Sequence, residues 1–327
     1  MLAKKNSEVI NRSVNELLTA IKSNIETVIV GKKEVADLLL ICLSCGGHAL
    51  IEDVPGLGKT SMVAALAASV NCSFQRIQFT PDVLPSDVTG FTMYHPVTGE
   101  ERFYQGAVMC NILLADELNR TSPKTQSALL QAMQEGVITV DGVTHDLPHP
   151  FMVCATQNPV EQAGTYPLPE AQLDRFLMRI NMGYPDKIDE MAILERNKRG
   201  GGSRQTNLSP VASAEDVLSL QEALDDIVCL EPVMSYIVNI VQHTRIHKDV
   251  TLGVSPRGAI ALMRASMGRA LLLNRTFVLP DDVQAMAYHT LCHRLILSTR
   301  AYTHNQTTEK VLGDVIQMTP VPVVSGL

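Results

Sequence analysis

Five short apolar segments, separated by helix-like patterns, constrain the fold of this chain more than any other feature of its sequence. They occupy residues 48–54, 73–79, 111–118, 150–158 and 175–184. Apolar runs of this length are typical of strands covered on both faces, and strands that alternate with helices form parallel sheets. The sequence therefore predicts an α/β fold built on a parallel five-stranded sheet.

Two further segments are predicted to be hairpins inserted in this sheet domain. Residues 137–147 alternate between apolar and polar around Asp141-Gly142, a pair typical of type I′ turns. Residues 90–106 have a strand-like run on each side of a Pro-Val-Thr-Gly turn. The hairpins lie before and after the helix that follows the third predicted strand.

Beyond about Tyr184 the strand-like pattern stops. Residues 197–210 are polar and rich in glycine, which indicates a flexible connection, and the chain after them has helical periodicity. We therefore predict an α/β domain over residues 1–186 and, over residues 187–327, a linker followed by an all-α domain.

Charge and composition argue against several classes of protein. The formal charge of −7, the pI near 5.7 and the 4% aromatic content without tryptophan disfavour binding to nucleic acid. No apolar run is long enough to cross a membrane, and the first residues read as an amphipathic helix rather than a signal peptide. Most of the seven cysteines lie in apolar segments, so we expect a cytoplasmic protein with reduced thiols.

A glycine-rich stretch, P-G-L-G-K-T-S, follows the first predicted strand and opens a helix-like segment, as a phosphate-binding P-loop does. Gly56 and Gly58 allow the backbone to turn its N–H groups toward an anion. Lys59 is expected to reach the outer phosphates of a nucleotide, and the Thr60 hydroxyl to ligate Mg²⁺. The general pattern has glycine where this chain has Asp53, which lies ahead of the cradle. The candidate nucleotide-binding residues of the loop are Pro55, Gly56, Leu57, Gly58, Lys59, Thr60 and Ser61.

Two later strands end in polar residues that suit the hydrolysis of a nucleotide. The third ends in Asp116-Glu117 and the fourth in Thr156-Gln157-Asn158. Asp116 is suited to hold Mg²⁺ through water, and Glu117 to polarise the attacking water. Asn158 is suited to orient that water. Because ligands of parallel sheets bind beyond the carboxyl ends of the strands, these residues are expected to share one site with the loop.

Two arginines are candidates to complete the site electrostatically. Arg175 immediately precedes the fifth strand, and Arg257 lies in the first turn of a predicted helix whose N-cap is Ser255. One would reach the phosphates from a neighbouring subunit and the other from a mobile second domain. For each arginine, a surface position or an ion pair within its own domain is the alternative that the sequence leaves open.

Together these motifs resemble the MoxR family of AAA+ ATPases. The resemblance runs from about Val28 to the end of the chain and rests on EDVPGLGKT, FTPDVLPSDVTG, LLADELNRTSPKTQSALLQAMQEG, ATQNPVEQAGTYPLPEAQLDRF, GVSPRG and LPDDVQAMAYHTLCHRL. In this family an acidic residue at the position of Asp53 is usual, and the hairpins correspond to the helix-2 and pre-sensor-1 insertions. The site residues that the resemblance implies are Lys59 and Thr60 as Walker A, Asp116 and Glu117 as Walker B, Asn158 as sensor 1, Arg175 as the arginine finger, Arg257 as sensor 2, and Gly31 near the adenine.

The resemblance implies an enzyme that uses ATP and Mg²⁺ at the subunit interfaces of a homo-oligomeric ring, with a hexamer expected. It also implies chaperone-like remodelling or maturation of partner proteins, often ones with a von Willebrand factor A domain. Three alternatives stay open: a nucleotide-gated scaffold with little turnover, a chelatase-like metal-insertion subunit, and a nucleic-acid-dependent motor, which the nearly neutral or acidic hairpins disfavour. Arg120, close to the third strand, competes with Arg175 as the finger.

Overall fold

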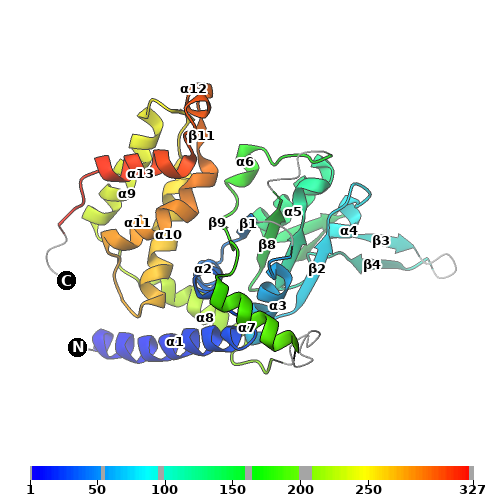
Figure 1. The fold of residues 1–327 in the computed structure, drawn as a ribbon. Coiled ribbons are helices and arrows are strands. Elements are labelled where there is room, and N and C mark those ends of the chain that lie inside the picture. Colours follow the sequence, from blue (N-terminus) through cyan, green and yellow to red (C-terminus); the bar gives the residue numbers. More distant parts are fainter. Residues whose placement is uncertain (1, 53–55, 95–98, 159–163, 199–207, 324–327) are drawn as a thin grey trace.

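The structure, a computed structural model, describes residues 2–52, 56–94, 99–158, 164–198 and 208–323. For residues 2–13, 196 and 197 it describes the backbone only. Figure 1 shows an α/β unit on the right and a helical unit on the left. The N-terminal helix runs beneath the helical unit and ends at the α/β unit (Figure 1).

Within the described residues, five parallel strands form the central sheet in the order β2-β5-β8-β1-β9. Their bounds are Ala49–Glu52 (β1), Phe74–Gln78 (β2), Ile112–Asp116 (β5), Met152–Gln157 (β8) and Met178–Ile180 (β9). Each strand lies inside one of the five predicted apolar segments, so the predicted sheet is confirmed. Because the strands are parallel, the carboxyl ends of neighbouring strands meet at one edge, where ligands of such sheets bind.

The two faces of the sheet lie in two separate hydrophobic cores, because successive side chains of a strand point to opposite faces. Ile51 and Leu114 belong to one core, and their neighbours Leu50 and Leu113 to the other. Helices contribute to each core: α2 (Lys33–Ser44) and α3 (Lys59–Ser69) to the first, and α5 (Pro123–Glu135) to the second. The remaining short helices of this unit are α4 (Pro85–Thr89), η1 (Leu118–Arg120) and α6 (Glu170–Leu173).

Both predicted hairpins are present. Asp141 and Gly142 have φ of +50° and +82°, as a type I′ turn requires, so the turn between β6 (Val137–Val140) and β7 (Val143–Asp146) is confirmed. The predicted Pro-Val-Thr-Gly turn falls mostly on residues 95–98, outside the described residues, while the strands on either side of it project from the α/β unit (Figure 1). The strands are β3 (Gly90–Tyr94), β4 (Glu101–Gln105), β6 (Val137–Val140) and β7 (Val143–Asp146).

The second unit is helical, as predicted, with one short antiparallel pair of strands that the sequence did not indicate. The predicted linker falls largely on residues 199–207, outside the described residues. Among the helices that the structure describes, none combines the length and the apolar character needed to cross a bilayer. The elements are α7 (Lys187–Lys198), α8 (Ala214–Asp225), α9 (Glu231–Ile246), β10 (Val250–Leu252), α10 (Pro256–Leu272), α11 (Pro280–Leu291), η2 (Cys292–Arg294), β11 (Ile296–Leu297), α12 (Thr299–Thr303) and α13 (Thr308–Met318).

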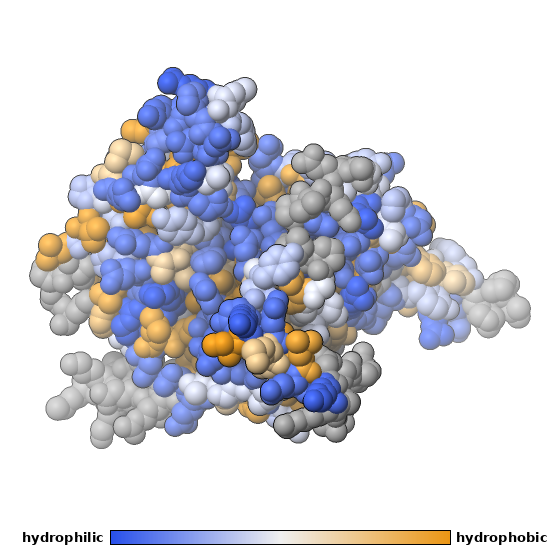
Figure 2. All heavy atoms as spheres, in the orientation of Figure 1, coloured by the Kyte–Doolittle hydropathy of each residue, from blue (hydrophilic) through white to orange (hydrophobic). Residues whose placement is uncertain are grey.

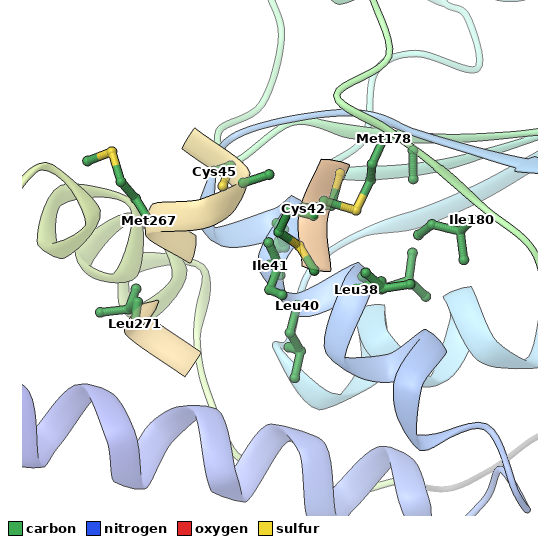
Figure 3. Close-up of a cluster of buried hydrophobic side chains, with 14 of the residues drawn as sticks. Leu38, Leu40, Ile41, Cys42, Cys45, Met178, Ile180, Met267 and Leu271 are labelled. Carbon is green, nitrogen blue, oxygen red and sulfur yellow. The ribbon is translucent and has the colours of Figure 1, made fainter. Parts of the chain in front are cut away.

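Helices α1 (Leu2–Glu26) and α2 join the two units into one core. Buried residues of α1, such as Leu18, share a cluster with residues of the sheet, of α2 and of α10. Figure 3 shows α2 between β9 and α10, with Cys42 near Met178 on one side and Cys45 near Met267 on the other. Apolar packing across this junction therefore fixes the helical unit against the sheet.

Helix α7 differs from the other helices of the second unit in its exposure. Ile188, Met191 and Leu194 are exposed, and Figure 2 shows an apolar patch over this helix. All seven cysteines lie in the described part of the chain and are free thiols. Burial raises the pKa of the Cys45 and Cys154 thiols to about 12, so these groups stay protonated.

Candidate functional site

A pocket of about 330 Å³ lies at the carboxyl edge of the sheet, where the P-loop meets β2, β5 and β8. It brings together most of the candidate residues predicted from the sequence: Gly56, Gly58, Lys59, Thr60, Ser61, Asp116, Glu117 and Asn158. The described lining is completed by Arg76, Gln78, Thr156 and Gln157. The convergence expected from the topology is therefore observed for the loop and the strand ends.

The loop leaves room for an anion above the start of α3. Gly56 and Gly58 have φ of +88° and +84°, a region that glycine adopts without strain. A Cβ added to either would meet no described atom within 4 Å, so the space beside both glycines is open as far as the described residues show. Helix α3 begins at Lys59, and its N-terminus adds positive potential. This geometry fits the phosphates of a nucleotide.

Thr156, at the end of β8, fixes the acidic pair of β5. Its hydroxyl donates to Asp116 Oδ1 over 2.7 Å and accepts from the Glu117 backbone N–H over 2.8 Å. The Thr156 side chain is buried, so these bonds are shielded from water. The pair is thus held at a fixed place on the pocket wall.

The second oxygen of Asp116 is bound by an arginine. Arg76 of β2 donates to Asp116 Oδ2 from Nη2 over 2.7 Å and from Nε over 3.2 Å. Together with the Thr60 hydroxyl, Asp116 offers the oxygen donors that Mg²⁺ prefers, so the residues present fit this ion. A cation held near Asp116 would share that carboxylate with Arg76.

Glu117 has an unusual backbone conformation. Its φ of +57° and ψ of +47° are left-handed, which is costly for a residue other than glycine, and such conformations cluster at functional sites. Its carboxylate Oε2 lies 3.4 Å from Arg120 Nη1 and accepts from Gln78 Nε2 over 3.4 Å. The turn after β5 therefore presents Glu117 to the pocket with its carboxylate between two polar partners.

Arg175 and Arg257 are absent from the described lining of the pocket. Arg175 is half-buried in the segment between α6 and β9. Arg257 is exposed in the first turn of α10, and Ser255 caps that helix as predicted, accepting from the Gly258 N–H. The pocket of a single chain thus brings the loop and strand ends together without either arginine.

Two other candidates, Leu57 and Gly31, are also absent from the described lining. Pro55, like Asp53, lies outside the described residues, and Leu57 is half-buried beside the loop glycines. Gly31 has φ of +72°, and an added Cβ would collide with the Asp189 carboxylate of α7. The segment of Gly31 thus packs closely against α7.

Sequence reasoning missed Arg76 and Gln78. Both stand at alternate positions near the end of β2, within Phe74–Gln78, so they share one face of the strand. Polar side chains at the carboxyl end of a predicted strand were the signal that identified Asp116 and Asn158. The same rule applied to the second strand would have found these two residues.

Comparison with known proteins gives the family. A sequence model described as "ATPase family associated with various cellular activities (AAA)" matches residues 48–178, and an "AAA lid domain" model matches residues 242–315. Protein YeaC of Bacillus subtilis, described as uncharacterized, is 50% identical over 95% of this chain and 96% of its own length. Chaperone MoxR1 of Mycobacterium tuberculosis is 38% identical over 93% of this chain and 82% of its own length. The chain belongs to the MoxR family of AAA+ ATPases.

A solved structure supports the same assignment. A proposed ATPase from Cytophaga hutchinsonii superimposes on this MoxR-family chain with a TM-score of 0.90 and 37% identity, over 99% of this chain and 100% of that chain. The family resemblance of the sequence motifs is confirmed, and so is the AAA+ core followed by a helical lid. We call the helical unit the lid from here on.

Proposed function

We propose that this MoxR-family chain binds ATP with Mg²⁺ and hydrolyses it. The observation that carries the proposal is the pocket in which Lys59 and Thr60 face the acidic pair Asp116-Glu117. Lys59 and the N–H groups of the loop would bind the phosphates. Thr60 would ligate Mg²⁺ directly and Asp116 through water. The bound ion would neutralise charge that develops on the phosphoryl oxygens.

Glu117 and Asn158 are the residues we assign to the attacking water. Glu117 would accept its proton, and Asn158 would orient it by hydrogen bonding. The left-handed backbone of Glu117 supports this role, because strained conformations of this kind cluster at active sites. Gln78 and Arg120 would hold the carboxylate until a nucleotide is in place.

We further propose that the chain works as a homo-oligomeric ring, with six subunits the expected number. Arg175 would act as the finger in the pocket of a neighbouring subunit, and its position away from the described lining of its own pocket supports this assignment. Arg120, the alternative, is paired with Glu117 of its own chain. The exposed apolar side chains of α7 support self-association.

The proposed role is the remodelling or maturation of partner proteins in the cytoplasm. The relative MoxR1 is named a chaperone, which supports this class of activity. Partners with a von Willebrand factor A domain are proposed from the family resemblance. Nucleic acid is not proposed as a partner, because the chain carries a formal charge of −7.

The test is phosphate release from ATP against protein concentration. Glu117→Gln should bind ATP but lose at least about a hundredfold in kcat, since the general base is gone. In Arg175→Ala, kcat should fall by a similar factor. In Arg300→Ala, at an exposed position of α12, kcat should equal that of wild type. The wild-type rate per subunit should rise with concentration if sites form between subunits, and chelation of Mg²⁺ should abolish turnover.

Other outcomes distinguish the alternatives. Equal rates for wild type and Arg175→Ala would overturn the finger assignment and direct attention to Arg120. Tight ATP binding without turnover, even with added partner, would identify a nucleotide-gated scaffold. Turnover that depends on a metal-inserting partner would identify a chelatase-like subunit.

A further inference from the structure

An ion pair between a buried arginine and a half-buried aspartate joins the α/β unit to the lid. Asp174, between α6 and β9, accepts from Arg294 Nε of η2 over 2.6 Å and from Ser255 Oγ of the lid over 3.0 Å. The Arg294 side chain is 3% exposed and that of Asp174 is 21% exposed. Both carboxylate oxygens of Asp174 are thus used by residues of the lid.

Arg294 also binds the backbone on the α/β side. Its Nη2 donates to the carbonyl oxygens of Phe176 over 2.6 Å and Asp174 over 3.2 Å, and its Nη1 donates to that of Leu177 over 3.3 Å. The guanidinium therefore holds the same short segment that contains Arg175. Hydrogen bonds to a charged, buried group are stronger than neutral ones, so the segment is fixed firmly to η2.

On the lid side, the first turn of α10 packs against the same arginine. A Cβ added to Gly258 would lie 3.0 Å from Arg294 Cδ and 2.4 Å from Val254 Cγ1, so only glycine fits there. Burial lowers the pKa of Arg294, Asp174 opposes this shift, and the positive charge of Arg257 adds to it. Arg257 precedes Gly258 in this turn, so the close packing of Gly258 places the turn that carries Arg257 beside Arg294.

We propose that Asp174, Arg294 and Ser255 form a linkage through which the segment that carries Arg175 moves together with the turn that carries Arg257. All three are positioning residues. The consequence for catalysis rests on the proposed function and on movement of the lid, because Arg257 is absent from the described lining of its own pocket. A nucleotide that drew Arg257 toward it would alter the Arg175 that the same chain offers to the next pocket. The linkage itself requires no nucleotide.

Two substitutions of equal size at Ser255 test the linkage. Asp and Asn both serve as N-caps, so each should preserve the cap of α10. Asn can still donate to Asp174, whereas Asp cannot donate and brings a second negative charge. Ser298→Asp, at the N-cap of α12 elsewhere in the lid, controls for the introduced charge.

The first readout is hydrogen exchange of the protein without nucleotide. In Ser255→Asp, amides of residues 170–178 and 256–264 should both exchange faster, by about tenfold or more, because a hydrogen bond to a charged group is lost. Ser255→Asn and Ser298→Asp should exchange like wild type in both segments. Faster exchange confined to residues 256–264, or equal effects of Asp and Asn, would overturn the proposal. If Ser255→Asp does not fold, Ser255→Ala replaces it, since it removes the donor without adding charge. Ser255→Ala should then show faster exchange in both segments.

The second readout is the dependence of ATP turnover on ATP concentration. Ser255→Asp should lower the Hill coefficient toward one, while Ser255→Asn should retain the wild-type value. A wild-type chain without ATP turnover would contradict the proposed function and leave the exchange result as the test of the linkage. Unchanged cooperativity in Ser255→Asp, in an active enzyme, would contradict the coupling between pockets.

Discussion

A single buried hydroxyl organises the acidic pair of the pocket. Thr156 contacts the Asp116 side chain and the Glu117 backbone at once, so it positions both residues assigned to Mg²⁺ and water. It also ties the end of β8 to the end of β5, in addition to the ladder between the strands. The threonine is therefore expected to affect both stability and turnover.

Thr156→Val keeps the shape of the side chain but removes both hydrogen bonds. It leaves an oxygen of the partly buried Asp116 carboxylate and the Glu117 backbone N–H without this partner, so the free energy of unfolding should fall by about 1–3 kcal/mol. Thr156→Ser keeps the hydroxyl, so its free energy of unfolding should fall less than that of Thr156→Val. Urea denaturation followed by circular dichroism measures the difference, and kcat should fall more in the Val variant than in the Ser variant. Equal losses in the two would show that the methyl group, not the hydroxyl, matters.

His48 predicts a pH dependence of stability. Its Nδ1 accepts from the Val153 N–H, which leaves Nε2 to donate to the Met133 carbonyl, both over 3.0 Å. Burial lowers the pKa of His48 to about 4, against about 6.5 for an exposed histidine. Between these values the unfolded chain binds more protons than the folded one. Stability should thus fall as pH drops from about 6.5 to 4, by up to about 3 kcal/mol from this group.

The measurement is the free energy of unfolding at several pH values in this window. His48→Gln should be less stable than wild type at neutral pH. Its free energy of unfolding should change less steeply with pH, because unfolding should take up fewer protons, by up to about one. Burial also lowers the pKa values of His289 and His293, so these residues contribute to the pH dependence of stability in both proteins. His304→Gln, at an exposed site, should keep the wild-type slope. An unchanged slope in His48→Gln would mean that another group governs the acid response.

At the residue scale, the sequence predicted the site residues at the end of a single strand but not the contacts between side chains of neighbouring strands. Asp116, Glu117 and Asn158 were found because a rule about strand ends needs only the chain itself. The pairing of Arg76 with Asp116 depends on β2 lying next to β5, which is a property of the sheet order. Strand order arises from packing of the whole unit, so no local pattern encodes it.

At the scale of elements, glycines mark where helices approach closely. Gly268 of α10 faces α2: an added Cβ would lie 2.9 Å from Ile41 Cγ2 and 3.0 Å from Cys45 Sγ. Gly313 of α13 has more space, since the nearest atom to an added Cβ is Tyr288 Oη at 3.4 Å. The two positions lie in helix interiors but differ in their surroundings, which makes them a matched pair.

Gly313→Ala should stabilise the protein by up to about 1 kcal/mol, because alanine favours helix more than glycine does. Gly268→Ala should instead destabilise it by about 1–3 kcal/mol, since Ile41 and Cys45 are buried and cannot move aside freely. Thermal or urea denaturation of the two variants gives the sign of each change. A stabilised Gly268→Ala would mean that α2 and α10 can separate without loss.

Elements with strong local signals were predicted well. Asp141-Gly142 predicted its turn because both residues accept positive φ, a requirement that two residues satisfy by themselves. The pair β10–β11 was missed because its strands have three and two residues and lie far apart in the chain. Strands this short show no periodicity and form only because the surrounding helices bring them together.

At the scale of the whole molecule, the two units share one hydrophobic core. Helix α1 contacts α3 of the α/β unit and also α8 and α10 of the lid. Its buried side chains, including Leu18, belong to the same cluster as Leu114 of β5 and Val283 of α11. The chain is therefore expected to unfold as one cooperative unit.

Leu18→Ala tests this expectation. The cavity left in the shared core should lower the free energy of unfolding by about 2–5 kcal/mol. Hydrogen exchange in urea should show the same decrease in the free energy of opening for amides of β5 and of α11, although Leu18 belongs to neither element. The exposed hairpin β3–β4 should open at a lower urea concentration than the core does. Its hydrogen exchange should be the same in Leu18→Ala as in wild type. A loss confined to α11 would show that the lid unfolds independently.

The shared core also bears on how relatives of this chain can be recombined. A lid taken from another protein and joined after β9 would meet α1 and α2 surfaces shaped for a different α10. Close contacts such as that of Gly268 with Ile41 and Cys45 leave little tolerance for such a mismatch. Working chimeras should therefore transfer α1 and α2 with the lid, although these helices stand at the opposite end of the sequence.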